Sequence, residues 1–530
     1  MHRVLSIFFC LFAVHGQLRA QTFPKEGAKV HYRIIGFSFE KVKQVSEYKL
    51  EIAKGYYNSD DSFRKNIIIS VTSAENRKVV EAPDFGSQYT WQVSYVTKGN
   101  TPTQRIKHHF SIGTVPEADT NIVRFRVIDK AVKYKDAYVF LDGNNGLYDM
   151  AGHLVWYMPQ IDTKANTHAQ VNDLKMTPQG TITFMENNRA YEINYNGDIL
   201  WRSPVKIGRE DSIEHYHHEF TRLSNGHYMV LSSESVLWKP DLPPEKDSSL
   251  YKATGGRMKN DTNKTKTHFG TVIEYDEKGN MVWSWKSSSY FMQSDVKYFN
   301  PKLRRQIIDV HENSFFFDEK NGYIYVSFKN ISRIVKVKYP EGNVVAAYGE
   351  VYKPDVPQTG NGLFCSQHSC KISDDGYLYL FNNNNCDSDG IMPTVVMMRE
   401  PGASNGALEK VWEYTCTDDG ISENPLFDRK AQEEKVRAKH PNFKSMNMRM
   451  MHPTSGGSVT ELPDHSFFVS MNNEYSKVFI VDRDKKVLWS GVSEKWNAGE
   501  NRWIIILQYR ASLVNSRKLL ESMIWKGRSI

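Results

Sequence analysis

The chain has 530 residues, of which 12% are aromatic and 24% are charged, and its formal net charge is +7. A chain of this length can form more than one domain and bury a large core, so disorder is not expected. The mild positive charge does not favour binding to nucleic acid. Short patches of Gly, Asn and Asp separate runs rich in Val, Ile, Tyr and Phe, which indicates an all-β protein.

The first twenty residues predict a secretory signal peptide. The basic residue Arg3 precedes an apolar run from Val4 to Val14, and the small residue Ala20 stands before Gln21. The apolar run is too short to span a bilayer in the usual way, and no later segment reaches the required length. We therefore expect a soluble, secreted or periplasmic protein without stable membrane insertion.

Four cysteines remain after this segment: Cys365, Cys370, Cys386 and Cys416. An oxidising compartment favours disulfides over a thiol site. Four cysteines allow three pairings, and the sequence does not choose among them. As a hypothesis, we expect a local pair between Cys365 and Cys370, because the short segment between them can loop back.

Residues 21–120 predict a small β-sandwich. Alternating segments such as VHYRIIGFSF, NIIISVTS and YTWQVSYV are separated by polar turns. Alternation in the last segment places Trp91, Val93 and Tyr95 on one face. For this domain we expect a packing role or dimerisation, which leaves a homodimer open.

A repeated motif, a turn followed by an apolar strand that usually ends in Trp, dominates the rest of the chain. Its six copies are AGHLVW (151–156), NGDILW (196–201), KGNMVW (278–283), EGNVVA (341–346), LEKVWE (408–413) and DKKVLW (484–489). Further short strands precede each copy, which is the pattern of four-stranded propeller blades. The sequence thus predicts a six-bladed β-propeller over residues 121–530, with the Trp strand outermost in each blade. Residues 501–509 are expected to supply the missing inner strand of the first blade.

Histidines recur where the inner strands begin. His218 and His368 each stand eight residues before a turn glycine, and His311 holds the corresponding place in the blade between them. Inner strands line the central channel, so these histidines should meet at one mouth of it. Further inner strands begin near His168 and His452.

Two kinds of chemistry fit such a group of imidazoles. A metal site would need three or four nitrogens around one ion, which His217, His218, His311 and His368 offer. A covalent site would need one unprotonated imidazole as the nucleophile, with neighbouring cations that hold an anionic group. The residue pattern by itself leaves both open.

Several separated motifs resemble those of the bacterial arylsulfate sulfotransferases, and the resemblance extends over the whole mature chain. The motifs are HHEF (217–220), DVHENS (309–314), FKN (328–330), SQHS (366–369) and HPTSGGS (452–458). The resemblance implies an enzyme that moves a sulfuryl group from an aryl sulfate donor to a phenolic acceptor without a nucleotide sulfate donor. It also implies small-molecule partners and no cofactor.

The resemblance assigns a role to each matching residue. His368 corresponds to the nucleophile, which takes the sulfuryl group as a sulfohistidine. The other matching residues are His218 and His311, which line the site, His217 and Asn313 as polar contacts for the substrate, and Thr454 in a matching loop. One position departs from the family pattern, because Lys329 stands where the family has Arg. Lysine keeps the charge but lacks the planar fork that binds two sulfate oxygens.

The implied chemistry is physically reasonable for these side chains. Sulfuryl transfer, like phosphoryl transfer, is expected to depend mainly on positioning and on stabilisation of negative charge. His311 is the expected proton donor for the leaving phenol and proton acceptor for the incoming one. Aromatic residues such as Trp238, Tyr290 and Phe291 are candidates for stacking on the phenol ring, with ordinary loop packing as the alternative.

Two other functions stay open at this point. The same histidines in a propeller metalloenzyme would bind iron, manganese or zinc. A propeller without catalysis would present aromatic loops to glycans or proteins. Neither a phosphate-binding loop nor a dinucleotide fingerprint is present, so a nucleotide cofactor is not expected.

Overall fold

The computed structural model of the protein describes residues 22–97, 106–161, 171–204, 213–238, 265–291, 308–349, 363–384, 392–402, 406–417, 419, 421, 456–472 and 476–526. The predicted signal peptide, residues 1–20, lies outside them. The chain forms two compact units, Met1–Thr114 and Val115–Ile530. In the described part of the chain, no helix is both long enough and apolar enough to cross a membrane.

The N-terminal unit is a β-sandwich. Its larger sheet has the order β1 (Ala28–Val30), β7 (Lys107–Ile112), β6 (Gln88–Thr97), β3 (Val45–Lys54) and β4 (Ile67–Ser73), and β2 (Ile34–Ser38) pairs with β5 (Arg77–Glu81). The one short helix described here, α1 (Asp60–Lys65), is capped by Ser59. Phe37 of β2 packs edge-on against Trp91 of β6 and Phe110 of β7, with ring centroids 5.3 Å and 5.8 Å away. The two sheets therefore share an aromatic core.

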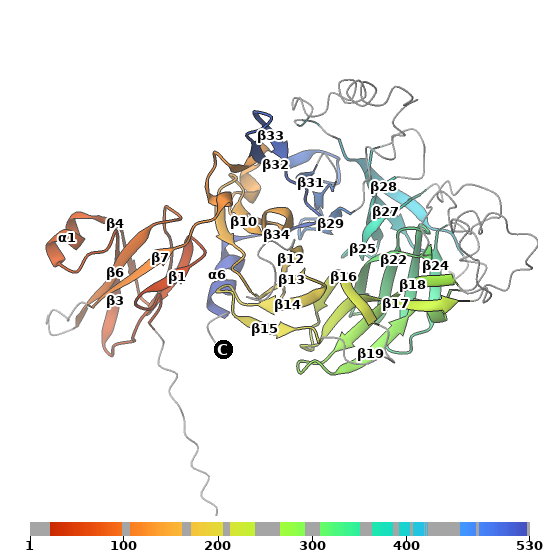
Figure 1. Ribbon diagram of the computed structural model, residues 1–530, viewed down its shortest axis with the longest axis horizontal. Helices are drawn as coiled ribbons and strands as arrows, with labels where there is room; N and C mark the ends of the chain where they lie inside the picture. Colours follow the sequence, from red (N-terminus) through yellow and green to blue (C-terminus); the bar gives the residue numbers. More distant parts are fainter. Residues whose placement is uncertain are drawn as a thin grey trace, which may run out of the picture. The chain divides into compact units, whose positions relative to one another are not determined.

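The second unit has six antiparallel sheets of four principal strands among the described residues, and they follow one another around a common centre (Figure 1). The first sheet has β9 (Tyr138–Leu141), β10 (Gly146–Asp149), β11 (Leu154–Tyr157) and β34 (Ala511–Val514). The second has β12 (Asn172–Met176), β13 (Ile182–Glu186), β14 (Arg189–Ile193) and β15 (Ile199–Arg202), and the third has β16 (Ile213–Arg222), β17 (Tyr228–Trp238), β18 (Thr265–Tyr275) and β19 (Met281–Lys286). This arrangement is the predicted six-bladed propeller.

The remaining three blades repeat the same order. They are β21 (Glu312–Asp318), β22 (Tyr323–Phe328), β23 (Arg333–Lys338) and β24 (Val344–Tyr348); β25 (His368–Ile372), β26 (Leu378–Asn382), β27 (Thr394–Arg399) and β28 (Glu409–Thr415); and β29 (Ser458–Glu461), β30 (Phe467–Ser470), β31 (Lys477–Val481) and β32 (Val487–Asn497). The last blade is extended by β33 (Arg502–Ile505) and β8 (Val123–Asp129), and β20 (Ile308–Asp309) pairs with β18. Helical segments are α6 (Arg517–Lys526) and the 3-10 turns η1 (Pro116–Ala118), η2 (Val132–Tyr134), η3 (Asp142–Asn144) and η4 (Ser287–Ser289).

The ring closes with a different segment from the one predicted. Residues 502–505 form β33, which folds back on β32 through the turn around Asn501, a residue at φ 51°. The closing strand is β34, which pairs antiparallel with β9. Its side chains and backbone also bridge to both neighbouring inner strands: Ser458 Oγ of β29 donates to Ala511 O at 3.3 Å, and Ser512 Oγ donates to Leu174 O of β12 at 2.8 Å. The turn before β33 lets this segment pair with the adjacent β32 through a short connection. The next segment, β34, therefore closes the ring.

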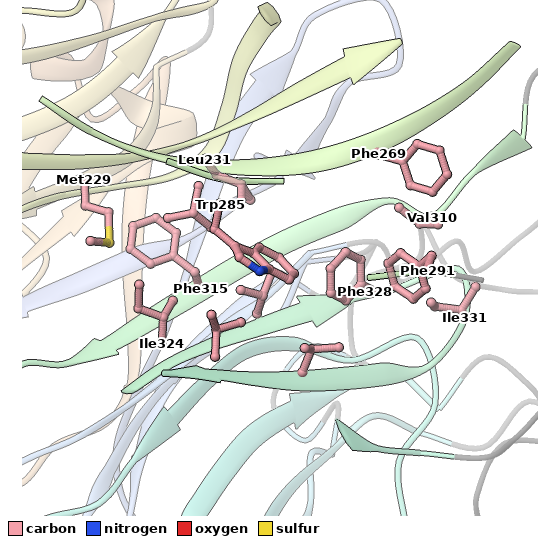
Figure 2. Close-up of a cluster of buried hydrophobic side chains, with 14 of the residues drawn as sticks. Met229, Leu231, Phe269, Trp285, Phe291, Val310, Phe315, Ile324, Phe328 and Ile331 are labelled. Atoms are coloured by element: carbon pink, nitrogen blue, oxygen red, sulfur yellow. The ribbon is translucent and has the colours of Figure 1, made fainter. Parts of the chain in front are cut away.

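Packing between blades follows the predicted apolar pattern. Four of the motif tryptophans, Trp156, Trp201, Trp283 and Trp412, lie in the outermost strands β11, β15, β19 and β28. Trp489 lies in β32, the fourth strand of the last blade, which β33 and β8 extend further. Figure 2 shows one interblade core, in which Met229 and Leu231 of β17 face Phe315 and Ile324 of the next blade. Burial of such side chains contributes about 1.5–3 kcal/mol each, and this stability holds the inner strand ends in place.

Candidate active site

The inner strands are irregular at the positions where the predicted site residues lie. In β16 the pairing jumps from Tyr216–Ser232 to Phe220–Val230, so residues 217–219 form a bulge. In β25 it jumps from His368–Phe381 to Lys371–Tyr379. Such bulges redirect side chains, and they often occur beside active sites.

Backbone conformation gives the same indication. The φ angles of His218, His311 and Ser369 are 65°, 54° and 54°. Residues other than glycine seldom adopt this left-handed conformation, and such residues are found preferentially at functional sites. The predicted strand starts are therefore strained positions that point side chains away from the regular ladder.

The structure brings His217, His218 and His311 together. The ring centroids of His218 and His311 are 5.2 Å apart, and those of His217 and His218 are 4.7 Å apart. The ring of Tyr509, just before β34, lies 5.8 Å from His218. Its hydroxyl group is buried without a hydrogen-bond partner among the described residues. Side chains from two blades and from the C-terminal segment thus converge on His218.

His368, at the first position of β25, is held through one of its two ring nitrogens. Only 1% of the residue is exposed. Its Nδ1 lies 3.3 Å from Ser366 O and 2.7 Å from Nδ2 of Asn383. The same amide nitrogen donates to Ser366 O at 2.7 Å and to Gly456 O at 3.2 Å.

These contacts indicate which nitrogen of His368 is available for chemistry. The two N–H groups of Asn383 satisfy the carbonyl oxygens of Ser366 and Gly456, because a carbonyl accepts and cannot donate. When Nδ1–H of His368 donates to Ser366 O, the lone pair is on Nε2, and the Asn383 amide nitrogen is then a second donor beside Nδ1 and not its hydrogen-bond partner. We assign this tautomer because the carbonyl oxygens of Ser366 and Gly456 already engage both hydrogens of the Asn383 amide.

Electrostatics keep His218 and His368 neutral. Burial, followed by the positive charge of Lys329 and by His311 and Arg510, lowers the pKa of His368 well below its usual value. Burial and the neighbouring His217, His311 and His368 lower the pKa of His218 in the same way. Desolvation and nearby positive charge both disfavour the charged imidazole. A neutral imidazole has a lone pair for attack on an electrophile.

Asn313 and Lys329 come from the blade between the two histidine bulges. Asn313 is fully buried, and its Nδ2 donates to Gln367 O at 2.6 Å, one residue before His368. The Lys329 backbone N–H donates to His311 O at 2.8 Å. Asn313 therefore links β21 to the start of β25 by a hydrogen bond. The charge of Lys329 contributes to the lowered pKa of His368.

The hypothesis of a local cysteine pair is wrong. Cys370 is a buried free thiol whose Sγ lies 3.9 Å from Ser314 Oγ, so it does not pair with Cys365. The inward direction imposed by β25 places this side chain between blades, where it packs in the core. Phe291 packs edge-on against Phe328 at 4.9 Å within the interblade core (Figure 2), and Tyr290 packs against the same cluster, which fits the alternative of ordinary packing for these two residues.

Some predicted residues lie outside the described part of the chain. They are Thr454, His168, His452 and Cys386, and the side chain of Trp238. Of the HPTSGGS motif, Gly456 is described, at φ 137°. A Cβ there would clash with Asn472 Nδ2 and come within 3.1 Å of the Tyr509 ring, so the backbone fits here only with glycine.

Sequence reasoning missed the charged network beneath the site. Nη1 of Arg510 pairs with Asp173 at 2.9 Å and with Glu219, and Nη2 donates to Asn313 O at 3.0 Å. Lys175 also bridges Asp173 and Glu219, at 2.7 Å and 2.8 Å. Although burial acts to raise it, the charges of Arg510 and Lys175 lower the pKa of Glu219 to about 2. The network fixes Asn313 and holds a positive charge below the histidines.

Asn383 was missed as well. The run FNNNNC (381–386) was the only signal in the sequence, and nothing in it pointed to His368. Among the described residues, no group of three or more His, Cys, Asp or Glu side chains has a geometry suited to a metal ion.

The comparisons with known proteins agree with this geometry. A family model described as arylsulfotransferase (ASST) matches residues 135–400, half of the chain. The chain belongs to the arylsulfotransferase family. The matched segment contains His218, His311, Lys329 and His368. Membership of this family implies that the protein is an aryl-sulfate sulfotransferase that acts on small molecules.

Other comparisons add no functional information about this arylsulfotransferase. No protein with a curated description matches the chain. Among solved structures, a protein of unknown function from Bacteroides caccae is 12% identical over 71% of this chain and 97% of that chain, with a TM-score of 0.38. The periplasmic gluconolactonase PpgL of Pseudomonas aeruginosa is 10% identical over 74% and 99%, with a TM-score of 0.36. These TM-scores are too low to support any statement about this chain.

Proposed function

We propose that the protein transfers the sulfuryl group by a ping-pong mechanism through a sulfohistidine at His368. The observation that carries the proposal is the contact between Nδ1 of His368 and Ser366 O, because a proton on Nδ1 that is donated to this carbonyl leaves the lone pair on Nε2. The lowered pKa of this imidazole supports the same role, because a nucleophile must be unprotonated.

In the first half-reaction, Nε2 of His368 attacks the sulfur of an aryl sulfate. The bond between sulfur and the aryl oxygen breaks, and the phenolate leaves with the electron pair. Positive charge develops on the imidazole, and Ser366 O stabilises it by accepting the Nδ1–H. In the second half-reaction, an acceptor phenol loses its proton and attacks sulfur, the S–N bond breaks, and the electron pair returns to Nε2.

Lys329 is the expected stabiliser of negative charge on the sulfuryl oxygens. After burial, its positive charge is the next largest cause of the lowered pKa of the His368 imidazole, which supports its assignment to this site. Preorganised positive charge near a transferring anionic group is usually the largest contribution to catalysis of this kind. A second histidine at the site exchanges the phenol proton.

The donor and acceptor are proposed to be small phenolic molecules that the enzyme meets outside the cytoplasm. This location follows from the predicted signal peptide. An exported enzyme has no access to a cytoplasmic nucleotide sulfate donor, so an aryl sulfate is the reasonable source of the sulfuryl group.

The test is the intact mass of the protein after rapid mixing with 4-nitrophenyl sulfate and no acceptor. The proposal expects a gain of one sulfuryl group, mapped to the peptide that contains His368, and its loss when phenol is added. His368→Asn should abolish both labelling and transfer.

A matched control is His227→Asn. It removes a partly buried histidine outside the site, whose Nδ1 lies 2.7 Å from Oε1 of Glu274. This variant should be labelled and should transfer like the wild type. Full transfer activity in His368→Asn would contradict the covalent mechanism and favour the metal-based alternative, in which activity depends on added metal. If the wild type is neither labelled nor active in transfer, and its ligand binding survives His368→Asn, the binding propeller is favoured.

A further inference from the structure

A line of three polar side chains runs behind His218. Nδ1 of His218 lies 2.7 Å from Nδ1 of His217, and Nε2 of His217 lies 3.0 Å from Oε1 of Glu312. The two histidines are consecutive residues in the bulge of β16, whereas Glu312 begins β21 in the next blade. The bulge thus lets neighbouring residues contact each other through their rings.

Counting donors and acceptors defines how protons are arranged along this line. An ionised carboxylate only accepts, so Nε2 of His217 carries a proton and donates it to Glu312. The two facing Nδ1 atoms then share one proton. When it is on His218, Nε2 of His218 has a lone pair and is a base. When it has moved to His217, Nε2 of His218 carries a proton and is an acid.

The electrostatics of the two histidines differ in a way that favours this exchange. Burial, with a contribution from the charge of Arg510, disfavours a positive charge on the ring of His218. His217 faces Glu312, which is 3% exposed and whose Oε2 has no hydrogen-bond partner among the described residues. A buried carboxylate is costly unless a positive charge is next to it. A positive charge is therefore better placed on His217 than on His218.

We propose that Glu312 and His217 are positioning residues that make His218, rather than His311, the group that exchanges a proton with the phenol; this rests on the proposed function. In the second half-reaction the phenol O–H breaks and Nε2 of His218 gains the proton. Its Nδ1–H passes to Nδ1 of His217, and the positive charge ends beside Glu312. The reverse movement protonates a leaving phenolate in the first half-reaction.

The surroundings of this line suit its role. The His217 side chain is 20% exposed, which gives the proton access to solvent between turnovers. On the other side, the Glu312 carboxylate lies against Gly270 of β18. A Cβ on Gly270 would come within 2.7 Å of Oε2 of Glu312, so only glycine leaves room for the carboxylate in this place.

The experiment compares the two half-reactions in Glu312→Gln. Glutamine still accepts from His217 but cannot stabilise its positive charge. Labelling by 4-nitrophenyl sulfate should stay within about threefold of wild type, because 4-nitrophenolate leaves without a proton. Transfer to phenols should slow by at least about tenfold, within the 10² to 10⁴ that positioned acid–base catalysis contributes. The slowing should increase with the pKa of the acceptor phenol.

Dependence on the acceptor pKa is the readout that a purely structural role would not change. If both half-reactions slow equally, or if transfer is unaffected at every acceptor pKa, the relay is wrong. Failure of the proposed function looks different, since the wild type itself would then not be labelled. Glu274→Gln, which breaks the buried pair with His227, is the matched control and should leave both half-reactions unchanged.

Two further variants, Gly270→Ala and His217→Asn, test the same relay if Glu312→Gln does not fold. The added methyl group displaces the Glu312 carboxylate without changing its charge, and asparagine removes the shuttling ring. Both should show the same selective loss of transfer to weakly acidic phenols. If His218→Asn retains that transfer while His311→Asn loses it, His311 is the acid–base residue and the proposal is overturned.

Discussion

Replacing Asn383 with Asp tests how the protein keeps its proposed nucleophile neutral. Asn383 is buried, and its amide nitrogen lies 2.7 Å from Nδ1 of His368. Aspartate has nearly the same shape but replaces a donor with a negative charge. The charge opposes Lys329 and Arg510, whose positive charges, together with burial, lower the pKa of His368. The pKa of His368 should therefore rise.

The size of the effect follows from the geometry. Two unit charges about 4 Å apart interact by about 4 kcal/mol at an effective dielectric constant of about 20, and about 1.4 kcal/mol corresponds to one pKa unit. Burial of the new carboxylate and its repulsion from the carbonyl oxygens of Ser366 and Gly456, 2.7 Å and 3.2 Å from the present amide nitrogen, reduce the gain. We expect the pKa of His368 to rise by about 1–3 units, the range typical of an adjacent opposite charge.

The assay is the pH dependence of the burst of 4-nitrophenolate, which reports formation of the covalent intermediate. In the wild type the lowered pKa leaves His368 unprotonated, so the burst rate should be constant from pH 9 down to pH values well below about 6.5. In Asn383→Asp it should fall about tenfold per pH unit below a midpoint that lies about 1–3 units higher. Asn384→Asp adds the same charge to a side chain that contacts Met392 O at 3.4 Å instead, and should behave as wild type. A variant profile identical to the wild-type profile would refute the assignment of Asn383.

Three further predictions concern charge and packing around the site. Lys329→Gln should slow labelling by about 10² or more through loss of charge stabilisation, whereas Lys329→Arg should retain labelling; equal rates for all three proteins would remove Lys329 from the site. Arg510→Met removes one of the two cations that the buried Asp173 and Glu219 share and leaves only Lys175, so the free energy of unfolding in urea should fall by up to about 3–5 kcal/mol. An unchanged midpoint would contradict this. Burial raises the pKa of Cys370 to about 12, so iodoacetamide at pH 8 should modify this thiol only after unfolding. Peptide mass analysis measures the modification, and rapid modification of the folded protein would contradict the buried position.

The sequence by itself determined the architecture and the principal candidates for the site. A turn and an apolar strand recur six times, five of them with a Trp, and four of those tryptophans, including Trp156, lie in outermost strands as predicted. This worked because both blade position and side-chain direction depend on local patterns, the two-residue period of a strand and the chemistry of turns. The histidines were found for the same reason, since each has the same place within its repeat.

Only the tertiary structure decided how those histidines are held and which proton each nitrogen carries. Arg510 and Asp173 are 337 residues apart in the chain and 2.9 Å apart in space, a contact that no local spacing predicts. The ring is closed by β34 instead of residues 501–509 because, of two similar apolar segments, the earlier one pairs with β32. The core positions of Cys370 and Phe291 depend on the packing of neighbouring blades. Strand pairing, burial and donor–acceptor matching are properties of segments that meet after folding, so the roles of Asn383, His217 and Glu312 become visible only when the ring is closed.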